Sequence, residues 1–353
     1  MPFCCKGMKR KVCVIGHFGF GKEMLDGQTV KTKTVTAELE RQLGENQVFK
    51  IDTHGGLCVL PSVVMQVYKG FQQCENIIIF PAQNGIRVFA PLCAALNRHF
   101  HRKLHYVVIG GWLNDFLKEH SKLKKTLQRF TGIYVETSTM KQALQMNGFA
   151  NVVVMPNFKN IRILSEGELV YSEGEPYRLC TFSRVTPQKG IEDACKAVAA
   201  VNDRAGRTVF TLDIYGQIDD AEKEWFASLK NAFPAYTRYM GTVPYDRSVE
   251  VLKDYYALLF PTRFYTEGIP GTILDAYAAG VPVISSRWES FSDVVDENAV
   301  GIGYTFADTQ DLIRVLTDIA KSPEVLNEMK PACIKKASCF TQEAVIEILL
   351  NSL

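Results

Sequence analysis

Two carboxylates on either side of a glycine-rich turn have the spacing that most directly points to chemistry in this sequence. Glu267 and Asp275 stand eight positions apart, and the apolar run 258–260 before them reads as a buried strand. From Gly271 onward the apolar residues follow helical spacing, so the turn 268–271 is predicted to lie at a helix N-terminus. First-turn N–H groups lack partners within the helix and the helix dipole is positive there, which favours a phosphate. The carboxylates can accept hydrogen bonds from sugar hydroxyls, so the segment predicts a site for a nucleotide-sugar.

This segment resembles the E-x7-E element of retaining glycosyltransferases of family 4, which have the GT-B fold, with Asp275 where the family has Glu. The resemblance implies that Glu267 orients the donor sugar and that Asp275 binds the ribose. It also implies that the backbone between them holds the diphosphate. The donor-binding residues expected here are Gly268, Ile269, Pro270, Gly271, Thr272, Ile273 and Asp275. A punctuated loop before a packed helix is the simpler alternative.

A second segment, 178–190, contains Arg184 and Lys189 and resembles the family's G-R-x-x-x-x-K-G signature, with Ser183 in place of the first glycine. The resemblance implies that both cations neutralise the departing diphosphate, on which negative charge grows in the transition state. We therefore expect Glu267, Arg184 and Lys189 to be the catalytic residues. A single cation at a helix start is more often a solvated surface charge, but the two elements together favour the functional interpretation. The resemblance places the nucleobase at the loop 241–244, with Val243.

The glycine-rich stretch 16–22 satisfies G-x-x-x-x-G-K, yet Glu23 occupies the position where a P-loop needs a Ser or Thr hydroxyl for Mg²⁺. A P-loop is therefore disfavoured, and the resemblance implies a loop that shapes the donor and acceptor sites. The donor-binding residues expected in this loop are Gly19 and Gly21, and those expected on the acceptor side are Asp26, Gln28, Lys31 and Trp112. A flexible polar loop and a core-packed Trp112 are the alternatives.

Histidines predict no metal site. His99, His101 and His105 do not share one helical face, and no nearby Cys or carboxylate completes a ligand set. The sequence also has no D-x-D pair, the element with which GT-A glycosyltransferases hold a divalent cation. We expect metal-independent chemistry and no cofactor, the nucleotide-sugar being a substrate.

Length and composition bound the class of protein. A chain of 353 residues exceeds one ordinary core, so two domains are expected. A formal charge of +2 argues against a nucleic-acid partner. The ten cysteines form no C-x-x-C pair, which is typical of free thiols in a reducing compartment. With no apolar run of membrane-spanning length, the chain is predicted to be cytoplasmic. Peripheral contact with the inner face of the cell membrane, through Lys6, Lys9, Arg10 and Lys11, is a further expectation, and simple solvation of these charges is its alternative.

Apolar runs of strand length alternate with helical patterns along the whole chain, which predicts parallel sheets covered on both faces. The predicted class is α/β, with two doubly wound Rossmann-like domains that face each other across a cleft in the GT-B manner. We expect an acceptor-side domain at 1–160, a linker at 161–177 and a nucleotide-sugar domain at 178–330. Helices at 331–353 are expected to pack back on the first domain.

The resemblance implies a transferase that moves a sugar from a UDP- or GDP-sugar to a hydroxyl of a glycan or polyprenyl-diphosphate-linked glycan, with retention. It is closest in character to bacterial enzymes of capsule, exopolysaccharide or O-antigen assembly. Two alternatives stay open: a non-catalytic partner subunit that binds nucleotide-sugar, and a GT-B nucleotide-sugar epimerase. A phosphorylase-like enzyme would need a pyridoxal lysine, and nothing in the sequence singles one out.

Overall fold

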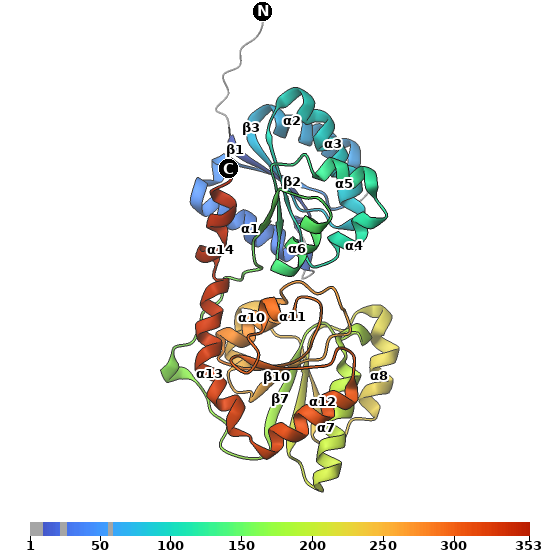
Figure 1. Ribbon diagram of the computed structural model, residues 1–353, viewed down its shortest axis with the longest axis vertical. Coiled ribbons are helices and arrows are strands. Elements are labelled where there is room, and N and C mark those ends of the chain that lie inside the picture. Colours follow the sequence, from blue (N-terminus) through green and yellow to red (C-terminus); the bar gives the residue numbers. More distant parts are fainter. Residues whose placement is uncertain (1–9, 22–26, 56–58) are drawn as a thin grey trace, which may run out of the picture. The chain divides into compact units, whose positions relative to one another are not determined.

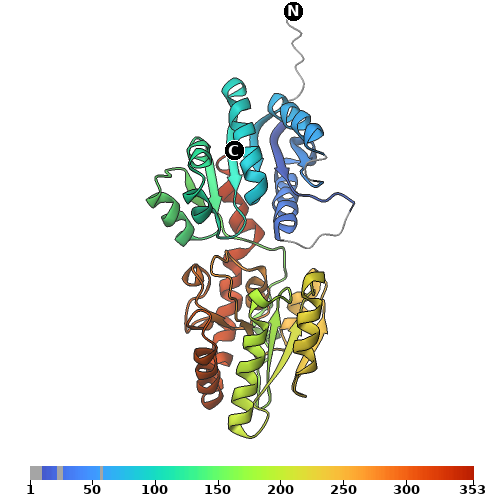
Figure 2. The same ribbon diagram turned by 90° about the vertical axis from the view of Figure 1, so that its right-hand side faces the viewer.

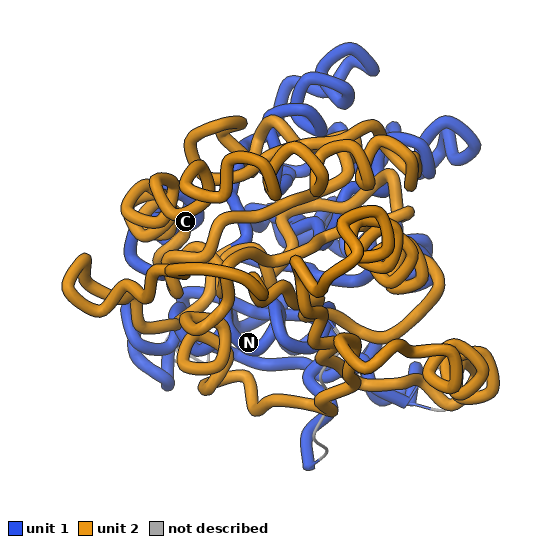
Figure 3. The backbone as a smooth tube through the Cα atoms, turned by 90° about the horizontal axis from the view of Figure 1, so that it is seen from below, with its two compact units in different colours: residues 1–157, 342–353 blue, residues 158–341 orange. Residues whose placement is uncertain are grey.

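The computed structural model describes residues 10–21, 27–55 and 59–353, and the chain divides into two compact units (Figure 3). Unit 1 consists of residues 1–157 and 342–353, and unit 2 of residues 158–341. Each unit is built around its own parallel sheet.

In the described part of unit 1, six parallel strands form one sheet in the order β2-β1-β3-β4-β5-β6. The strands are β1 Arg10–Gly16, β2 Val48–Asp52, β3 Cys74–Ile79, β4 Lys103–Val107, β5 Gly132–Val135 and β6 Val152–Val154. The helices are α1 Gly27–Leu43, α2 Leu60–Gln73, α3 Gln83–Phe100, α4 Leu113–Lys118, α5 Ser121–Leu127, α6 Ser138–Met146 and α14 Gln342–Leu350. The central strands are apolar along their length because helices cover the sheet on both sides (Figure 1).

In unit 2, six parallel strands follow the order β12-β11-β10-β7-β8-β9 within the described residues. The strands are β7 Tyr177–Phe182, β8 Phe210–Tyr215, β9 Thr237–Gly241, β10 Ala257–Phe260, β11 Val283–Ser286 and β12 Gly301–Tyr304. The helices are α7 Ile191–Ala205, α8 Lys223–Asn231, α9 Ser248–Leu252, α10 Gly271–Ala278, α11 Phe291–Val294, α12 Thr309–Lys321 and α13 Glu324–Ala337.

Two apolar clusters cover the faces of the unit 2 sheet. One contains the buried apolar residues of α10 with Cys333 and Ala337 of α13, and the other contains those of α7 and α12 with Leu326 and Met329 of α13. The helices themselves are drawn in Figures 1 and 2. The strand order reverses between β7 and β10, which are neighbours in the sheet although β8 and β9 lie between them in the chain. In open α/β sheets such a reversal leaves a crevice at the carboxyl ends of the strands, where ligands bind.

The predicted class, two doubly wound α/β domains, is confirmed, but two of the predicted boundaries need correction. The segment 161–177 is not a linker, because it lies within unit 2. Its Leu164 is buried in the unit 2 core, and the Leu164 amide donates to the Ala278 carbonyl at 2.9 Å. Ile161 and Ile163 pack against the same core, so the start of this stretch is held by apolar contacts.

The terminal segment 331–353 is divided between the units and does not pack as one piece. Residues 331–337 form the end of α13, whose Cys333 is buried in the unit 2 core. Helix α14 belongs to unit 1, where Gln342 donates to Glu38 and Glu343 lies 3.8 Å from the Arg41 guanidinium. Only this last helix packs on the first domain as expected.

No helix in the described part of the chain is long and apolar enough to cross a membrane.

A buried histidine makes the stability of unit 1 depend on pH. His105 on β4 is fully buried, with Nδ1 3.1 Å from the Tyr134 hydroxyl and Nε2 3.3 Å from the Asn76 side-chain oxygen. Burial, aided by the nearby Lys103 charge, lowers its pKa from 6.5 to about 4. Between these values the unfolded chain binds the proton and the folded chain does not, so stability is lost as the pH falls from 6.5 towards 4.

We predict that His105→Gln removes about 2 kcal/mol of the stability difference between pH 7.5 and pH 5. The opening free energy of the β4 amides, measured by hydrogen exchange, should change less with pH in the variant than in the wild type. The exposed His99 offers the control His99→Gln. An unchanged pH dependence in His105→Gln would contradict the assignment.

Candidate functional site

The loops that carry the predicted catalytic residues leave neighbouring strands at the same edge of the unit 2 sheet. The segment 183–190 follows β7, and the segment 261–270 follows β10. These strands flank the point where the strand order reverses, so the fold places both sequence elements at one crevice.

A glycine without room for a side chain joins the two loops. Gly190 adopts a left-handed backbone with φ of 68°, and a Cβ at this position would lie 1.8 Å from the Pro261 carbonyl oxygen. The Arg263 amide also donates to the Gln188 carbonyl at 2.8 Å. The loops therefore meet backbone to backbone, which requires glycine at position 190 for both its conformation and its size.

The contact brings Lys189 and Glu267 together as an ion pair, although 78 positions separate them in the sequence. Their side chains are only 19% and 13% exposed. Thr262 Oγ1 donates to Glu267 Oε1 at 3.3 Å, and Lys189 Nζ lies 5.5 Å from the centroid of the Phe260 ring. Two residues predicted from separate motifs thus form one partly buried pair.

The N-terminus of α10 lies just beyond Glu267, and no side chain caps it. The Pro270 carbonyl accepts from the amides of Ile273 and Leu274 at 3.0 and 3.4 Å, whereas the amides of Gly271 and Thr272 have no acceptor among the described residues. The hydroxyl of Thr272 is also buried without a hydrogen-bond partner there. Open donors at a helix N-terminus form a ready anion site.

The predicted donor-binding residues of this turn differ in how far they are exposed to solvent. The side chains of Ile269 and Ile273 are buried in the unit 2 core, and the Ile273 amide is already bonded to the Pro270 carbonyl. Gly268 is buried as well, while Pro270 is half-buried.

Asp275 lies one turn inside α10 and is 3% exposed. Both of its oxygens accept hydrogen bonds from Lys159 Nζ, each at 2.6 Å. Burial raises the pKa of Asp275, and the Lys159 charge opposes this rise. The expected ribose contact of Asp275 stays a prediction. Sequence reasoning missed Lys159, because it stands in a polar stretch with no periodic pattern or motif.

Among the described residues, neither Arg184 nor Val243 forms a hydrogen bond or ion pair with Lys189 or Glu267. The Arg184 side chain is exposed, and its nearest carboxylate is Asp219 at 3.4 Å. The part of the chain that the structure describes shows no contact between Arg184 and Lys189 or Glu267. Val243 follows β9 and packs half-buried against the unit 2 core.

The glycine-rich loop of unit 1 is tied to the end of β2. Gly19 and Gly21 have left-handed backbones, with φ of 57° and 78°. Asp52 accepts from the amides of Phe18 and Phe20 at 2.9 and 3.1 Å. Burial raises the pKa of Asp52, but these and other backbone N–H donors outweigh it and hold the pKa below its usual value.

Two of the residues expected on the acceptor side, Lys31 and Trp112, already have polar partners within unit 1. Asp26 is outside the described residues, and Gln28 is half-buried in the first turn of α1. Lys31 forms a buried ion pair with Glu136. Trp112 donates its indole N–H to the Ile109 carbonyl at 2.8 Å and packs edge-on against Phe116. Sugar stacking on Trp112 stays a prediction.

The structure also shows a histidine pair that the sequence did not indicate. His17 and His54 follow β1 and β2, with His54 Nδ1 2.9 Å from His17 Nε2. His17 Nδ1 lies 2.7 Å from the Thr29 hydroxyl. Neighbouring parallel strands brought these two histidines together, which no linear spacing reveals. The described residues contain no group of three metal-ligating side chains.

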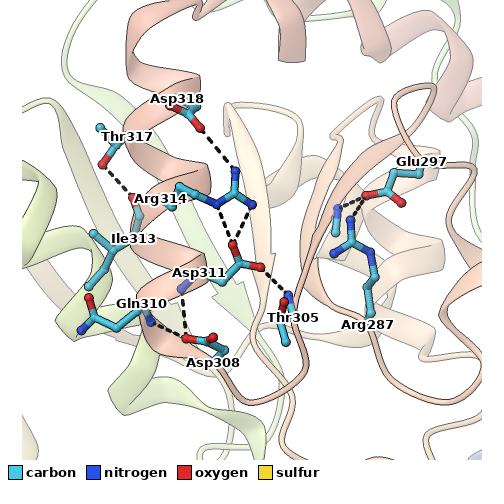
Figure 4. A network of polar contacts seen from close by, with 11 residues as sticks. Arg287, Glu297, Thr305, Asp308, Gln310, Asp311, Ile313, Arg314, Thr317 and Asp318 are labelled. Atoms are coloured by element: carbon cyan, nitrogen blue, oxygen red, sulfur yellow. Dashed lines mark hydrogen bonds and ion pairs between the residues drawn. The ribbon is translucent and has the colours of Figure 1, made fainter.

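A cavity of about 410 Å³ lies elsewhere in unit 2, and no predicted site residue lines it. Its lining includes Arg287, Glu297, Arg314, Val315, Asp318 and Ile319. Arg287 pairs with Glu297, while Arg314 bonds Asp311 at 2.8 Å and approaches Asp318 at 3.5 Å (Figure 4). Each guanidinium already has a carboxylate partner, so the cavity offers no unpaired charge.

Comparison with known proteins places this site in unit 2 within a recognised domain. Residues 176–322 match the family described as "Glycosyl transferases group 1". The amylovoran biosynthesis glycosyltransferase AmsK of Erwinia amylovora is 24% identical over 151 residues. That match covers 42% of this chain and only 37% of AmsK.

Solved structures resemble the whole chain. HepE of Anabaena, solved in complex with UDP and glucose, aligns with a TM-score of 0.73 at 15% identity, covering 98% of this chain and 100% of that one. Sucrose-phosphate synthase of Thermosynechococcus elongatus aligns with a TM-score of 0.75 at 13% identity, covering 97% and 98%. At these identities the likeness establishes the fold, which is GT-B.

The backbone contact at Gly190 predicts a large effect of one methyl group. Gly190→Ala should cost more than about 3 kcal/mol, since it adds a clash with Pro261 to the strain of a left-handed alanine. Gly206, at the other end of α7, has φ of 66° but open space around it. Gly206→Ala should therefore cost only about 1 kcal/mol, the backbone strain alone. Urea unfolding of both variants measures the difference, and equal costs would contradict the close contact.

Proposed function

We propose that this chain is a glycosyltransferase that moves a sugar from a nucleotide diphosphate donor, a UDP- or GDP-sugar, to a hydroxyl of a glycan or lipid-linked glycan, with retention. The observation that carries the proposal is the Lys189–Glu267 pair beside the uncapped N-terminus of α10. This arrangement places a cation, open amide donors and a carboxylate where the fold forms a ligand crevice.

The parts have separable chemical roles in this proposal. The amides of Gly271 and Thr272 hold the donor diphosphate, where the helix dipole favours negative charge. Lys189 stabilises the charge that grows on the departing diphosphate, which a metal ion would otherwise have to do. When Lys189 turns to the phosphate, Glu267 is released to accept hydrogen bonds from hydroxyls of the donor sugar. The preformed pair keeps both groups in place before the donor binds.

The relatives support this assignment in outline. The curated relative AmsK takes part in amylovoran biosynthesis, which favours a role in polysaccharide assembly. HepE was solved with UDP and with UDP-glucose, which favours a uridine donor. A lipid-linked acceptor, peripheral membrane contact and a cytoplasmic location belong to the same proposal.

Nucleotide binding gives the first test. We predict that one nucleoside diphosphate among UDP, GDP and ADP raises the melting temperature of the wild type, because a ligand of the folded state stabilises it by mass action. Lys189→Met should lower the affinity for that nucleotide about 10-fold or more, as expected for a lost charge-assisted hydrogen bond. The matched control is Lys196→Met, an exposed lysine of α7 paired with Glu192. Equal effects of the two variants would contradict the role of Lys189.

Donor turnover gives the second test and needs no identified acceptor. We predict slow hydrolysis of the matching nucleotide-sugar by the wild type, lowered at least about 100-fold in Glu267→Gln, because a group that acts on the reacting sugar affects the transition state more than ground-state binding. The variant should bind the nucleoside diphosphate within about 3-fold of the wild type. Chelation by EDTA should leave the wild-type rate unchanged. Binding without any turnover would instead support a non-catalytic nucleotide-sugar-binding subunit.

A further inference from the structure

The ion pair between Lys159 and Asp275 lies against the same helix N-terminus as the Lys189–Glu267 pair. Lys159 Nζ donates to both Asp275 oxygens at 2.6 Å. The Lys159 side chain passes the first residue of α10, with Cδ 3.5 Å from the position that a Cβ on Gly271 would take. Its side chain is 21% exposed, so the ammonium stays reachable while Asp275 is buried.

The position of this lysine is unfavourable for an ordinary structural cation. Helix dipoles favour cations at the C-terminus and anions at the N-terminus. Here the Lys159 side chain passes Gly271 in the first turn of α10, and its ammonium is balanced by the buried carboxylate of Asp275, which is itself costly to desolvate. A bound anion in front of the helix would make this arrangement favourable.

Lys159 and Thr272, near the N-terminus of α10, also have hydrogen-bonding groups without a protein partner among the described residues. An ammonium has three donors, and the Asp275 oxygens accept two of them, so one Lys159 N–H has no acceptor among the described residues. The buried Thr272 hydroxyl lacks a partner within the same part of the chain. The two groups are independent observations of unused polar capacity beside the open amides of Gly271 and Thr272.

We propose that Lys159 is a phosphate-binding residue of the donor site, and that Asp275 is the positioning residue that holds its ammonium in front of α10. This inference rests on the proposed function. It differs from the ribose role implied by the resemblance. Asp275 is 3% exposed and bonds Lys159 and the Ser248 side chain, so in this inference it acts on the diphosphate through Lys159.

The two roles of Asp275 separate when a nucleoside diphosphate is compared with its nucleoside. We expect Lys159→Met and Asp275→Asn to weaken UDP binding by about 10- to 100-fold, the usual range for a hydrogen bond to a charged group. Both should leave uridine binding within about 3-fold of the wild type. The same comparison is made between GDP and guanosine. Isothermal titration measures the diphosphates, and competition measures the weaker nucleosides.

A matched control comes from a second lysine of unit 2. Lys336 has a 19% exposed side chain and donates to both oxygens of Asp296, at 2.9 and 2.8 Å. Lys336→Met should therefore leave UDP affinity unchanged. Lys159→Arg keeps the charge and should recover much of the affinity, which a purely structural role would not predict. Lys159→Met and Lys159→Arg also carry the test if Asp275→Asn fails to fold.

Three results would overturn the inference. Wild-type UDP affinity in Lys159→Met would exclude the phosphate contact. Equal losses of UDP and uridine binding in Asp275→Asn, with Lys159→Met unaffected, would assign Asp275 to the ribose instead. A wild-type protein that binds no nucleoside diphosphate would overturn the proposed function, and this inference with it.

Discussion

The approach of Gly190 to the Pro261 carbonyl is the constraint on which the candidate site depends. It forces the loop after β7 against the loop after β10, and it leaves 1.8 Å between a Cβ at position 190 and the carbonyl oxygen. Because the two loops cannot separate without losing this backbone contact, Lys189 reaches Glu267 and both lie beside the first turn of α10. The Arg263 side chain adds a second tie, since it bonds Asp193 in the first turn of α7 at 2.6 and 2.7 Å.

Two similar lysine–carboxylate ion pairs determine the charge balance at the candidate site. Lys189 with Glu267 and Lys159 with Asp275 each place a reachable ammonium against a less exposed carboxylate. Without a ligand the four charges cancel, so the site avoids the cost of unpaired charge in a partly buried place. In the proposed donor site, an arriving diphosphate would meet two ammonium groups that the ion pairs already hold in place. Binding then exchanges one charged partner for another, and little side-chain entropy remains to be lost.

The α/β class and the Lys189–Glu267 neighbourhood could be foreseen from the sequence, because continuous apolar runs and a glycine-punctuated helix start are local signals. The packing of Leu164 could not, since the scattered apolar residues of 161–177 do not reveal which partners they meet. Lys159 was missed because no motif or periodic pattern marks it, and the His17–His54 contact depends on which strands become neighbours. The Arg184 side chain is exposed and approaches Asp219 at 3.4 Å, so its role at the diphosphate stays a prediction. The sequence therefore indicated residues that lie in local motifs, such as Lys189 and Glu267, but not the residues that contact the site from distant parts of the chain.

The most direct measurement is a crystal structure of the chain with the nucleoside diphosphate that stabilises it. The account predicts phosphate oxygens within hydrogen-bond distance of the Gly271 and Thr272 amides, and Lys189 turned from Glu267 to the phosphate. A diphosphate bound in the cavity lined by Arg287 and Arg314, with the Lys189–Glu267 pair undisturbed, would contradict it.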